Sequence, residues 1–540
     1  MFRAPGDLIL TLDDRWMNLN KAGIHEGGET ILRKSKPKQC RKLQLPGRLL
    51  VVVCLAVLSG CLAPHGSGRG LLVKPGGARL NLVSGAAPPL PELPVEITGE
   101  STHAETPGKG RGARVEDPEI DDILNIPQDL QPFSRGVGAD AVSPACRQKQ
   151  LERYQASQFA PWSTKSTLFD CDVAAASMRE MATGVWFGEN RRHIDIKILN
   201  ALLDRCDLDH FPSQNRPAVA VGSASLRLLP TMKPFYKNSM TPSGDMSPTE
   251  LSFDRLQNTE IKVNEPLRLL HVSSDGAWAY VEASFAGGWV ESSSVRLIDE
   301  PTIKRFMALP KVVVVRESAL LVDHATEASS QPKIGALLPV IREMGDRYLV
   351  LVACNPGTPQ AHLHHVTIDK GAVRPFPLDF SAENVALIGG ELLGRPYGWG
   401  DAYHDRDCSG TTRDFFLPFG IWLPRNSREQ IGAGPKISFD GLSPAGKEEL
   451  IRSRAHPFLT LIHMEGHIML YSGLYEQRPT IFHNVWGINY RDERGETSKR
   501  IIGKSVITSL EPGKELPRVG RTFLERFTGM RVLTDGCEAE

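Results

Sequence analysis

Cysteine is scarce in this chain, and several other features are missing. The 540 residues include only 9 cysteines, too few for a disulfide scaffold. The 63 basic and 63 acidic side chains cancel, so the composition gives no reason to expect a nucleic-acid partner. Beyond the N-terminal region, no segment has the unbroken apolar length of a membrane-spanning helix. With 41% hydrophobic and 23% charged residues, the composition is that of a soluble protein of several domains.

Five of the cysteines have no role that the sequence indicates. Five is an odd number, so at least one of them is free or outside any bridge. We expect most of them to be small buried apolar side chains. These five are Cys146, Cys171, Cys206, Cys354 and Cys537.

The N-terminal region has the anatomy of an export signal. Three basic residues between positions 41 and 48 precede the apolar run 49–58, which is too short to span a membrane stably. Ser59, Gly60 and Cys61 follow, and this ending resembles the lipobox of bacterial lipoproteins, in which the cysteine is acylated. Residues 1–61 are therefore predicted to be a leader with Cys61 as the lipid attachment site. An ordinary signal peptide cut nearby is the alternative.

Two segments without visible chemistry come next. Residues 62–116 are rich in Gly, Pro, Ala and Ser, so they cannot bury enough apolar surface to offset their ordering entropy and are predicted to form a flexible tether. Residues 117–215 show helical spacing, above all over 172–183 and 194–203. They are predicted to form a small, mainly helical N-terminal domain with a structural role.

The region from 216 to 375 has the pattern of short strands between turns. Two similar series, 216–300 and 301–375, predict two small barrels in tandem. The end of the first series, with Trp278 and then Gly288-Trp-Val290, resembles bacterial SH3-like domains. Three histidines of the second series lack nearby Cys or acidic partners and are predicted to lie at a solvated strand end, with no metal: His362, His364 and His365.

Cys408 is the candidate nucleophile. It follows a loop of small residues from Pro396 and precedes a predicted helix over 411–417. Backbone N–H groups and the positive end of a helix dipole stabilise a thiolate, which is the nucleophilic form of cysteine. We therefore expect a thiolate at this position.

Two histidines provide the other groups that such a cysteine needs. His467 begins an apolar strand and is predicted to accept the thiol proton and later donate it to the leaving amine. His483 lies on the next predicted strand, so a hairpin would set the two imidazoles side by side, with His483 orienting His467. The remaining histidines of this region are weaker candidates: His404, His456 and His463.

Four motifs between 380 and 510 resemble the NlpC-type family of bacterial cell-wall cysteine peptidases. They are Tyr397-x-Trp-Gly, Asp407-Cys-Ser-Gly, Leu423-Pro-Arg-x-Ser-x-x-Gln and His467-Ile-Met-Leu-Tyr-Ser-Gly. The resemblance implies a multidomain α+β protein with a papain-like catalytic domain over 376–540. It also implies that the cysteine attacks an amide of the peptidoglycan stem peptide and that His483 is the third catalytic group.

The same resemblance implies substrate-binding roles. Asp407 and Ser409 match a pair that contacts the free amino group of the first residue, L-alanine. Ser427 matches a substrate-contacting serine, and Tyr397 a tyrosine on the oxyanion side. In related proteins the first barrel closes the amino end of the groove, a role for which Tyr280, Phe285 and Trp289 are the candidates. Trp399 is as well explained by core packing.

The loop before Cys408 departs from the family pattern. Trp399-Gly400-Asp401 stands where the family often has Trp-Gly-Gly, and His404, Asp405 and Arg406 add further charge. The resemblance therefore does not fix the shape of the subsite that this loop borders.

The predicted function is that of a lipid-anchored cysteine endopeptidase of the cell envelope, facing the periplasm. It would hydrolyse the γ-D-glutamyl–diamino acid bond of stem peptides through a thioester, as a monomer and without cofactor or metal. Leu62 after Cys61, rather than Asp, favours the outer membrane in a Gram-negative cell. Two alternatives are a non-catalytic peptidoglycan-binding lipoprotein, and an amidase or acyltransferase on the same scaffold.

Overall fold

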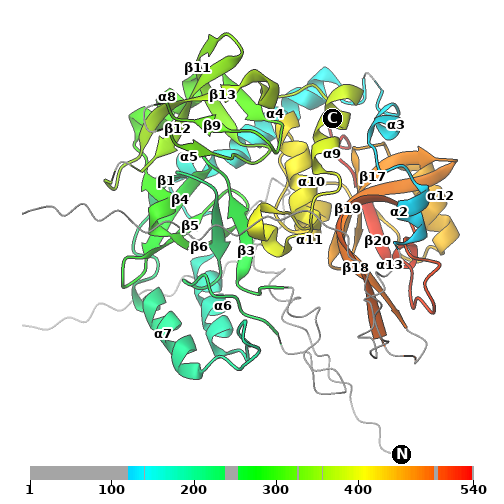
Figure 1. The fold of residues 1–540 in the computed structure, drawn as a ribbon, viewed down its shortest axis with the longest axis horizontal. Helices are drawn as coiled ribbons and strands as arrows, with labels where there is room; N and C mark the ends of the chain where they lie inside the picture. The colour runs from blue at the N-terminus through cyan, green and yellow to red at the C-terminus, as the bar shows by residue number, and fades with distance from the viewer. Residues whose placement is uncertain are drawn as a thin grey trace, which may run out of the picture. The chain divides into compact units, whose positions relative to one another are not determined.

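Three sheets organise the residues that the computed structural model describes, which are 119–138, 140–237, 253–324, 327–355, 357–491, 495 and 497–537 (Figure 1). The predicted leader, its Cys61 and the predicted tether lie outside these residues. Within these ranges, no helix is both long enough and apolar enough to cross a membrane.

The first two sheets have seven strands each and share one topology. Their strand orders are β3-β2-β6-β5-β4-β1-β7 and β10-β9-β13-β12-β11-β8-β14, so each strand of the first has its counterpart in the second. Each sheet encloses its own apolar cluster. The predicted pair of barrels is confirmed, and the second repeats the fold of the first.

The barrel strands are short. Those of barrel 1 are β1 (Arg216–Ala220), β2 (Ala224–Arg227), β3 (Gln257–Ile261), β4 (Pro266–Val272), β5 (Trp278–Glu282), β6 (Gly287–Glu291) and β7 (Val295–Leu297). Those of barrel 2 are β8 (Lys311–Val314), β9 (Leu321–Val322), β10 (Ser329–Ser330), β11 (Leu337–Met344), β12 (Arg347–Cys354), β13 (His362–Asp369) and β14 (Val373–Pro375). Helix α8 (Glu300–Ala308) joins the barrels and begins at Asp299, whose side chain accepts a hydrogen bond from the backbone of Thr302.

The N-terminal segment is mainly helical, as predicted, and its helices pack against more than one sheet. Ile120 packs with the third sheet, whereas Met178 and Leu199 pack against Trp278 and Trp289 of barrel 1. The helices are α2 (Asp121–Asn125), α3 (Gln131–Ser134), α4 (Pro144–Gln158), α5 (Ala160–Ser163), α6 (Cys171–Thr183) and α7 (Ile196–Cys206).

A disulfide joins α4 to the last described residue of the chain. Cys146 on α4 is bonded to Cys537, and their Cα atoms lie 4.8 Å apart. The other three cysteines without a predicted role are free: Cys171, Cys206 and Cys354.

The third sheet belongs to the C-terminal domain and has the order β15-β20-β16-β17-β18-β19. Helices α9 and α10 pack on one face of this sheet, and α10 contributes Phe415 and Phe416 to that packing. The other face of the sheet forms a second apolar cluster (Figure 1). This arrangement confirms the predicted α+β class. The strands are β15 (Ile437–Ser438), β16 (Thr460–Met464), β17 (His467–Tyr475), β18 (Arg478–Arg491), β19 (Thr497–Ser509) and β20 (Phe527–Val532). The helices are α9 (Ala382–Leu392), η5 (Trp399–His404), α10 (Cys408–Phe416), η6 (Leu417–Phe419), α11 (Ser427–Gly432), α12 (Pro444–Arg454) and α13 (Phe523–Arg526).

Candidate active site

Cys408 is the first residue of α10. The helix starts here because Asp407 is its N-cap: one carboxylate oxygen accepts a hydrogen bond from the backbone N–H of Gly410 at 2.8 Å. The backbone N–H of Ile468, next to His467, lies near enough to the Cys408 sulfur to act on its pKa. The thiol therefore lies where the helix begins and where strand β17 begins.

The surroundings of Cys408 favour the protonated thiol, contrary to the thiolate expected from the helix dipole. Burial and the adjacent Asp407 carboxylate raise the pKa of Cys408 to about 12. The N–H of Ile468 and the Arg425 guanidinium act in the other direction but do not outweigh these two effects. A base must therefore remove the proton as the sulfur attacks.

His467 and His483 are brought together by strands β17 and β18. In the register of this hairpin Leu470 lies opposite Phe482, so His483 is a diagonal neighbour of His467 on the same face. The Nε2 atom of His467 lies 2.8 Å from Nδ1 of His483. Nδ1 of His467 is therefore the ring nitrogen left for the thiol.

Both imidazoles are neutral in this environment. Burial lowers the pKa of His467 to about 3, with a further lowering by Arg526, and it lowers the pKa of His483 well below its usual value. The Phe523 ring packs edge-on against both, with ring centres 6.0 and 6.1 Å away. A neutral His467 can accept the thiol proton.

Arg425 holds Asp407 with both ends of its guanidinium. Nη1 and Nη2 lie 3.0 and 2.7 Å from the two carboxylate oxygens, and Nη1 also donates to the Ser409 hydroxyl at 2.8 Å. Asp407 further accepts from the Ser409 hydroxyl and from the backbone N–H groups of Gly410 and Gly400. A carboxylate has about four acceptor positions. The acceptor positions of Asp407, where the substrate ammonium is predicted to bind, are therefore already taken by donors of the protein itself.

The Leu423–Gln430 motif supports the start of α10. Its Arg425 binds Asp407, and its fully buried Gln430 donates to the carbonyl oxygens of Ser409 and Pro424 at 2.9 Å each. Gln430 also accepts a 2.7 Å hydrogen bond from the Thr412 hydroxyl. The sequence contained this motif, but the support that Arg425 and Gln430 give was not predicted because no pattern shows which residues they reach.

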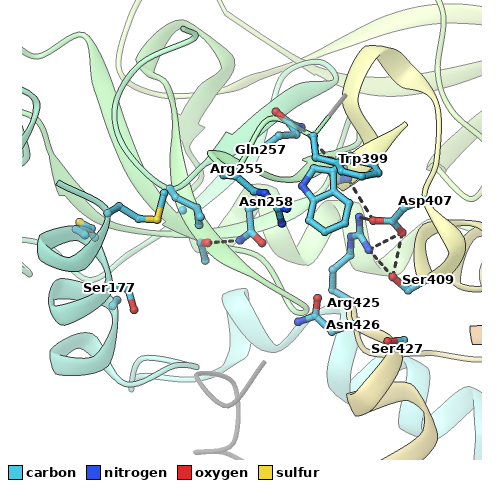
Figure 2. A pocket seen from close by; sticks show the side chains of 18 of the residues that line it. Ser177, Arg255, Gln257, Asn258, Trp399, Asp407, Ser409, Arg425, Asn426 and Ser427 are labelled. Atoms are coloured by element: carbon cyan, nitrogen blue, oxygen red, sulfur yellow. Dashed lines mark hydrogen bonds and ion pairs between the residues drawn. The ribbon is translucent and has the colours of Figure 1, made fainter. Parts of the chain in front are cut away.

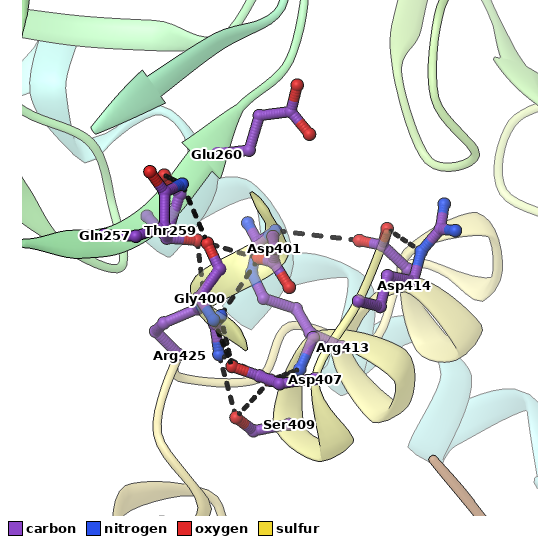
Figure 3. A network of polar contacts seen from close by, with 12 residues as sticks. Gln257, Thr259, Glu260, Gly400, Asp401, Asp407, Ser409, Arg413, Asp414 and Arg425 are labelled. Atoms are coloured by element: carbon purple, nitrogen blue, oxygen red, sulfur yellow. Dashed lines mark hydrogen bonds and ion pairs between the residues drawn. The ribbon is translucent and has the colours of Figure 1, made fainter. Parts of the chain in front are cut away.

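The loop between Gly400 and Asp405 attaches the catalytic domain to barrel 1. Gln257 donates to the carbonyl oxygen of Gly400 at 3.0 Å, and the Thr259 hydroxyl donates to Asp401 at 2.8 Å (Figure 3). Asp401 also lies 3.1 Å from Nη2 of Arg425. The charge that distinguishes this loop from the family pattern therefore serves an interdomain contact.

The attachment extends into a buried network of ion pairs. Asp414 on α10 pairs with Lys262 of barrel 1 and with Arg406, both at 2.7 Å, and Arg406 pairs with Glu317 of barrel 2 at 2.6 Å. Burial acts to raise the pKa of Asp414, but Lys262 and Arg406 outweigh it and hold that pKa well below its usual value. The helix that carries Cys408 is thus fixed to both barrels.

A cavity of about 410 Å³ opens at Cys408 and extends to α6. Figure 2 shows Asp407, Ser409 and Arg425 on the α10 side and Ser177 on α6, with Trp399 and Asn258 between them. Three of the predicted substrate contacts besides Asp407 line it, as does one barrel candidate: Tyr397, Ser409, Ser427 and Tyr280.

Two barrel candidates are placed elsewhere. Phe285 lies under the Arg413 guanidinium, 3.6 Å from ring centre to Cζ, and Trp289 is fully buried with its indole N–H directed to the Met178 sulfur. Neither is among the residues that line the cavity. Trp399 both lines the cavity and packs against Phe253 at 5.0 Å, so packing and substrate contact are compatible.

The other histidines have separate partners. His463 lies 2.7 Å from the Thr528 hydroxyl, His404 pairs with Glu260 at 2.6 Å, and the exposed His364 lies 3.5 Å from Asp323. The backbone of His456 bonds to Thr460. Across the described ranges, no group of three or more His, Cys, Asp or Glu side chains is placed to hold a metal ion.

A thiol at a helix start, next to the strand that carries His467, and two adjacent neutral imidazoles on an antiparallel sheet are the groups of a papain-like cysteine hydrolase site. Comparison with known families agrees: residues 394–502 match the NlpC/P60 family, residues 98–211 its N-terminal NLPC_P60 stabilising domain, and residues 234–291 an SH3 domain of the SH3b1 type. Residues 394–502 therefore contain an NlpC/P60 domain, and NlpC/P60 is a family of cysteine peptidases. The stabilising-domain match begins inside the segment predicted to be a tether.

A solved structure of an NlpC/P60 protein shares the fold. An NlpC/P60 endopeptidase from Photobacterium damselae subsp. piscicida superposes with a TM-score of 0.70 at 21% identity, over 78% of this chain and 99% of that one. A NlpC/P60 family protein from Bacillus cereus ATCC 10987 has a TM-score of 0.41 at 17% identity, over 59% of this chain and 99% of that one. A search of curated protein sequences gave no match.

Proposed function

We propose that this protein hydrolyses the γ-D-glutamyl–diamino acid bond of peptidoglycan stem peptides. The observation that carries the proposal is that α10 begins at Cys408 near the backbone N–H of Ile468, next to His467, whose imidazole lies 2.8 Å from that of His483. The family match gives the reaction class, and the cavity between α6, barrel 1 and α10 has the size for a short peptide.

The proposed reaction has two steps. Nδ1 of His467 takes the Cys408 proton while the sulfur attacks the amide carbon, and the resulting imidazolium gives that proton to the leaving amine. A thioester between Cys408 and the γ-carboxyl group of D-glutamate remains. His467 then takes a proton from water, whose oxygen attacks the thioester, and returns it to the sulfur.

The amino end of the substrate is the part that the geometry constrains least. Selection of a free L-alanine ammonium by Asp407 would require it to share a carboxylate that Arg425 already holds through both oxygens. The discriminating comparison is between L-Ala-γ-D-Glu-diaminopimelate with a free and with an acetylated amino group. Preference for the free amine by a factor of ten or more, about 1.4 kcal/mol, would establish ammonium recognition.

The test of the proposed activity is release of L-Ala-γ-D-Glu from this tripeptide by the wild-type protein and by Cys408→Ala. Turnover by the wild type alone supports the proposal. Equal product from both proteins would contradict it, and binding without turnover would favour the non-catalytic alternative.

We also propose that the protein works at the cell envelope and is anchored through Cys61. The Cys146–Cys537 disulfide supports an oxidising compartment, where such bonds persist. Cys61→Ser is expected to move the protein from the membrane fraction to the soluble fraction. Unchanged membrane association would contradict lipidation at this cysteine.

A further inference from the structure

A row of polar groups continues from the two histidines into the next strand. Nε2 of His483 lies 3.1 Å from the hydroxyl oxygen of Thr508 on β19, and that hydroxyl donates to the carbonyl oxygen of Ser509 at 2.9 Å. His483 lies opposite Val506, so Thr508 is its diagonal neighbour on the same face, as His483 is of His467. Thr508 is fully buried.

The direction of each hydrogen bond follows from the end of the row. A carbonyl oxygen only accepts, so the single hydroxyl proton of Thr508 is directed to Ser509. The Thr508 oxygen then accepts the N–H from Nε2 of His483. Nδ1 of His483 is left without a proton and accepts the N–H from Nε2 of His467.

We infer that Thr508 is a positioning residue that fixes the tautomer of the catalytic base. A neutral imidazole carries one ring proton, so a proton on Nε2 of His467 leaves Nδ1 bare. Nδ1 is the nitrogen that must receive the Cys408 proton. Thr508 thus acts on His467 through His483, without touching the substrate. The inference rests on the proposed function for its catalytic consequence, but the tautomer itself does not depend on the substrate.

Removal of the hydroxyl leaves His483 without its acceptor. In Thr508→Val, a proton on Nε2 of His483 would be buried without a partner, which is costly. The tautomer with the proton on Nδ1 of His483 avoids this cost, and it donates to Nε2 of His467. The proton of His467 then moves to Nδ1, where it blocks uptake of the thiol proton.

The experiment compares Thr508→Val, Thr508→Ser and a matched control, Thr480→Val. Thr480 is also a buried threonine of this sheet, but its hydroxyl bonds to Ser472 and Gly473 rather than to a histidine. The readouts are the ¹⁵N spectrum of labelled histidines, with the His467 signals assigned through His467→Gln, and kcat/KM on the tripeptide.

The wild type is expected to show an unprotonated Nδ1 on His467. Thr508→Val is expected to show a protonated Nδ1 and a loss of about 10–100-fold in kcat/KM, the size of effect found when a partner that orients a histidine is removed. Thr508→Ser keeps the hydroxyl and should restore both readouts, and Thr480→Val should change neither. A protonated Nδ1 in the wild type, or an unchanged Nδ1 in Thr508→Val, would overturn the inference. If the wild type does not cleave the tripeptide, the proposed function is overturned. The ¹⁵N spectrum then decides the inference about Thr508 by itself.

Discussion

Arg425 binds both carboxylate oxygens of Asp407, the residue directly before the nucleophile. Its Nη1 lies 3.0 Å from one oxygen and its Nη2 lies 2.7 Å from the other. The guanidinium also lies 3.1 Å from Asp401, so one buried cation serves two carboxylates whose side chains are only 12% and 13% exposed. The position of Cys408 thus depends on a charge that the sequence places 17 residues further on.

Loss of this cation should destabilise the protein strongly. Arg425→Met leaves two largely buried carboxylates without their cation, and breaking a buried pair in this way costs about 3–5 kcal/mol. Urea unfolding followed by tryptophan fluorescence would measure the difference. Exposed Arg135→Met is the control and should change stability by no more than about 0.5 kcal/mol. Similar values for the two variants would show that the ion pair does not stabilise the site.

Gly400 is a position where the barrel contact excludes a side chain. Its φ is 58°, and a Cβ there would lie 2.5 Å from the carbonyl oxygen of Gln257 in barrel 1. Gly400→Ala should therefore cost more than about 1 kcal/mol and lower peptidase activity, because the loop before Cys408 must shift. Gly390→Ala, on α9 with open space around it, is the matched control. Equal activity and stability of the two variants would count against the contact.

The contact between His404 and Glu260 should make stability depend on pH. The hydrogen bond that His404 donates to Glu260 raises the pKa of His404, and burial opposes this effect less strongly. A raised histidine pKa gives a contribution that is fully present below the unfolded value of about 6.5 and is lost as pH rises through the folded value. Melting temperatures across neutral and alkaline buffers should therefore fall in the wild type relative to His404→Gln. Parallel curves would refute this role of His404.

The protonated thiol predicts a specific alkylation profile. Because burial and Asp407 raise the pKa of Cys408 to about 12, its reaction with iodoacetamide should be slow at neutral pH and rise steadily into the alkaline range. Mass spectrometry of the peptide that contains Cys408 separates it from the other free cysteines. A rate already constant from acid to neutral pH would instead indicate a preformed thiolate–imidazolium pair.

The sequence predicted the fold class and the approach of His467 to His483, because both follow from local patterns. Short strands between turns predict the barrels, and two histidines on neighbouring apolar strands predict a shared face of a hairpin. The helix predicted to start at Thr411 begins at Cys408 because Asp407 caps it.

Contacts between distant segments could not be predicted in the same way. Arg425 and Asp401 lie on either side of Cys408 in the sequence, and both bond to the Thr259 hydroxyl of β3. No periodicity in the sequence shows that Thr259 lies between these two side chains. The raised pKa of Cys408 argues against the expected thiolate, and its main cause, burial, is encoded in no motif. The helices between 121 and 206 show helical spacing, but the spacing does not show that they divide among several cores.

The covalent state of Cys408 during turnover tests the central claim most directly. The protein would be mixed with L-Ala-γ-D-Glu-diaminopimelate, quenched in acid and digested, and the Cys408 peptide examined by mass spectrometry. The account predicts that this peptide carries the L-Ala-γ-D-Glu acyl group as a thioester, which disappears when the substrate is exhausted. Product formation with Cys408 unmodified at every time point, or with the acyl group on another residue, would contradict it.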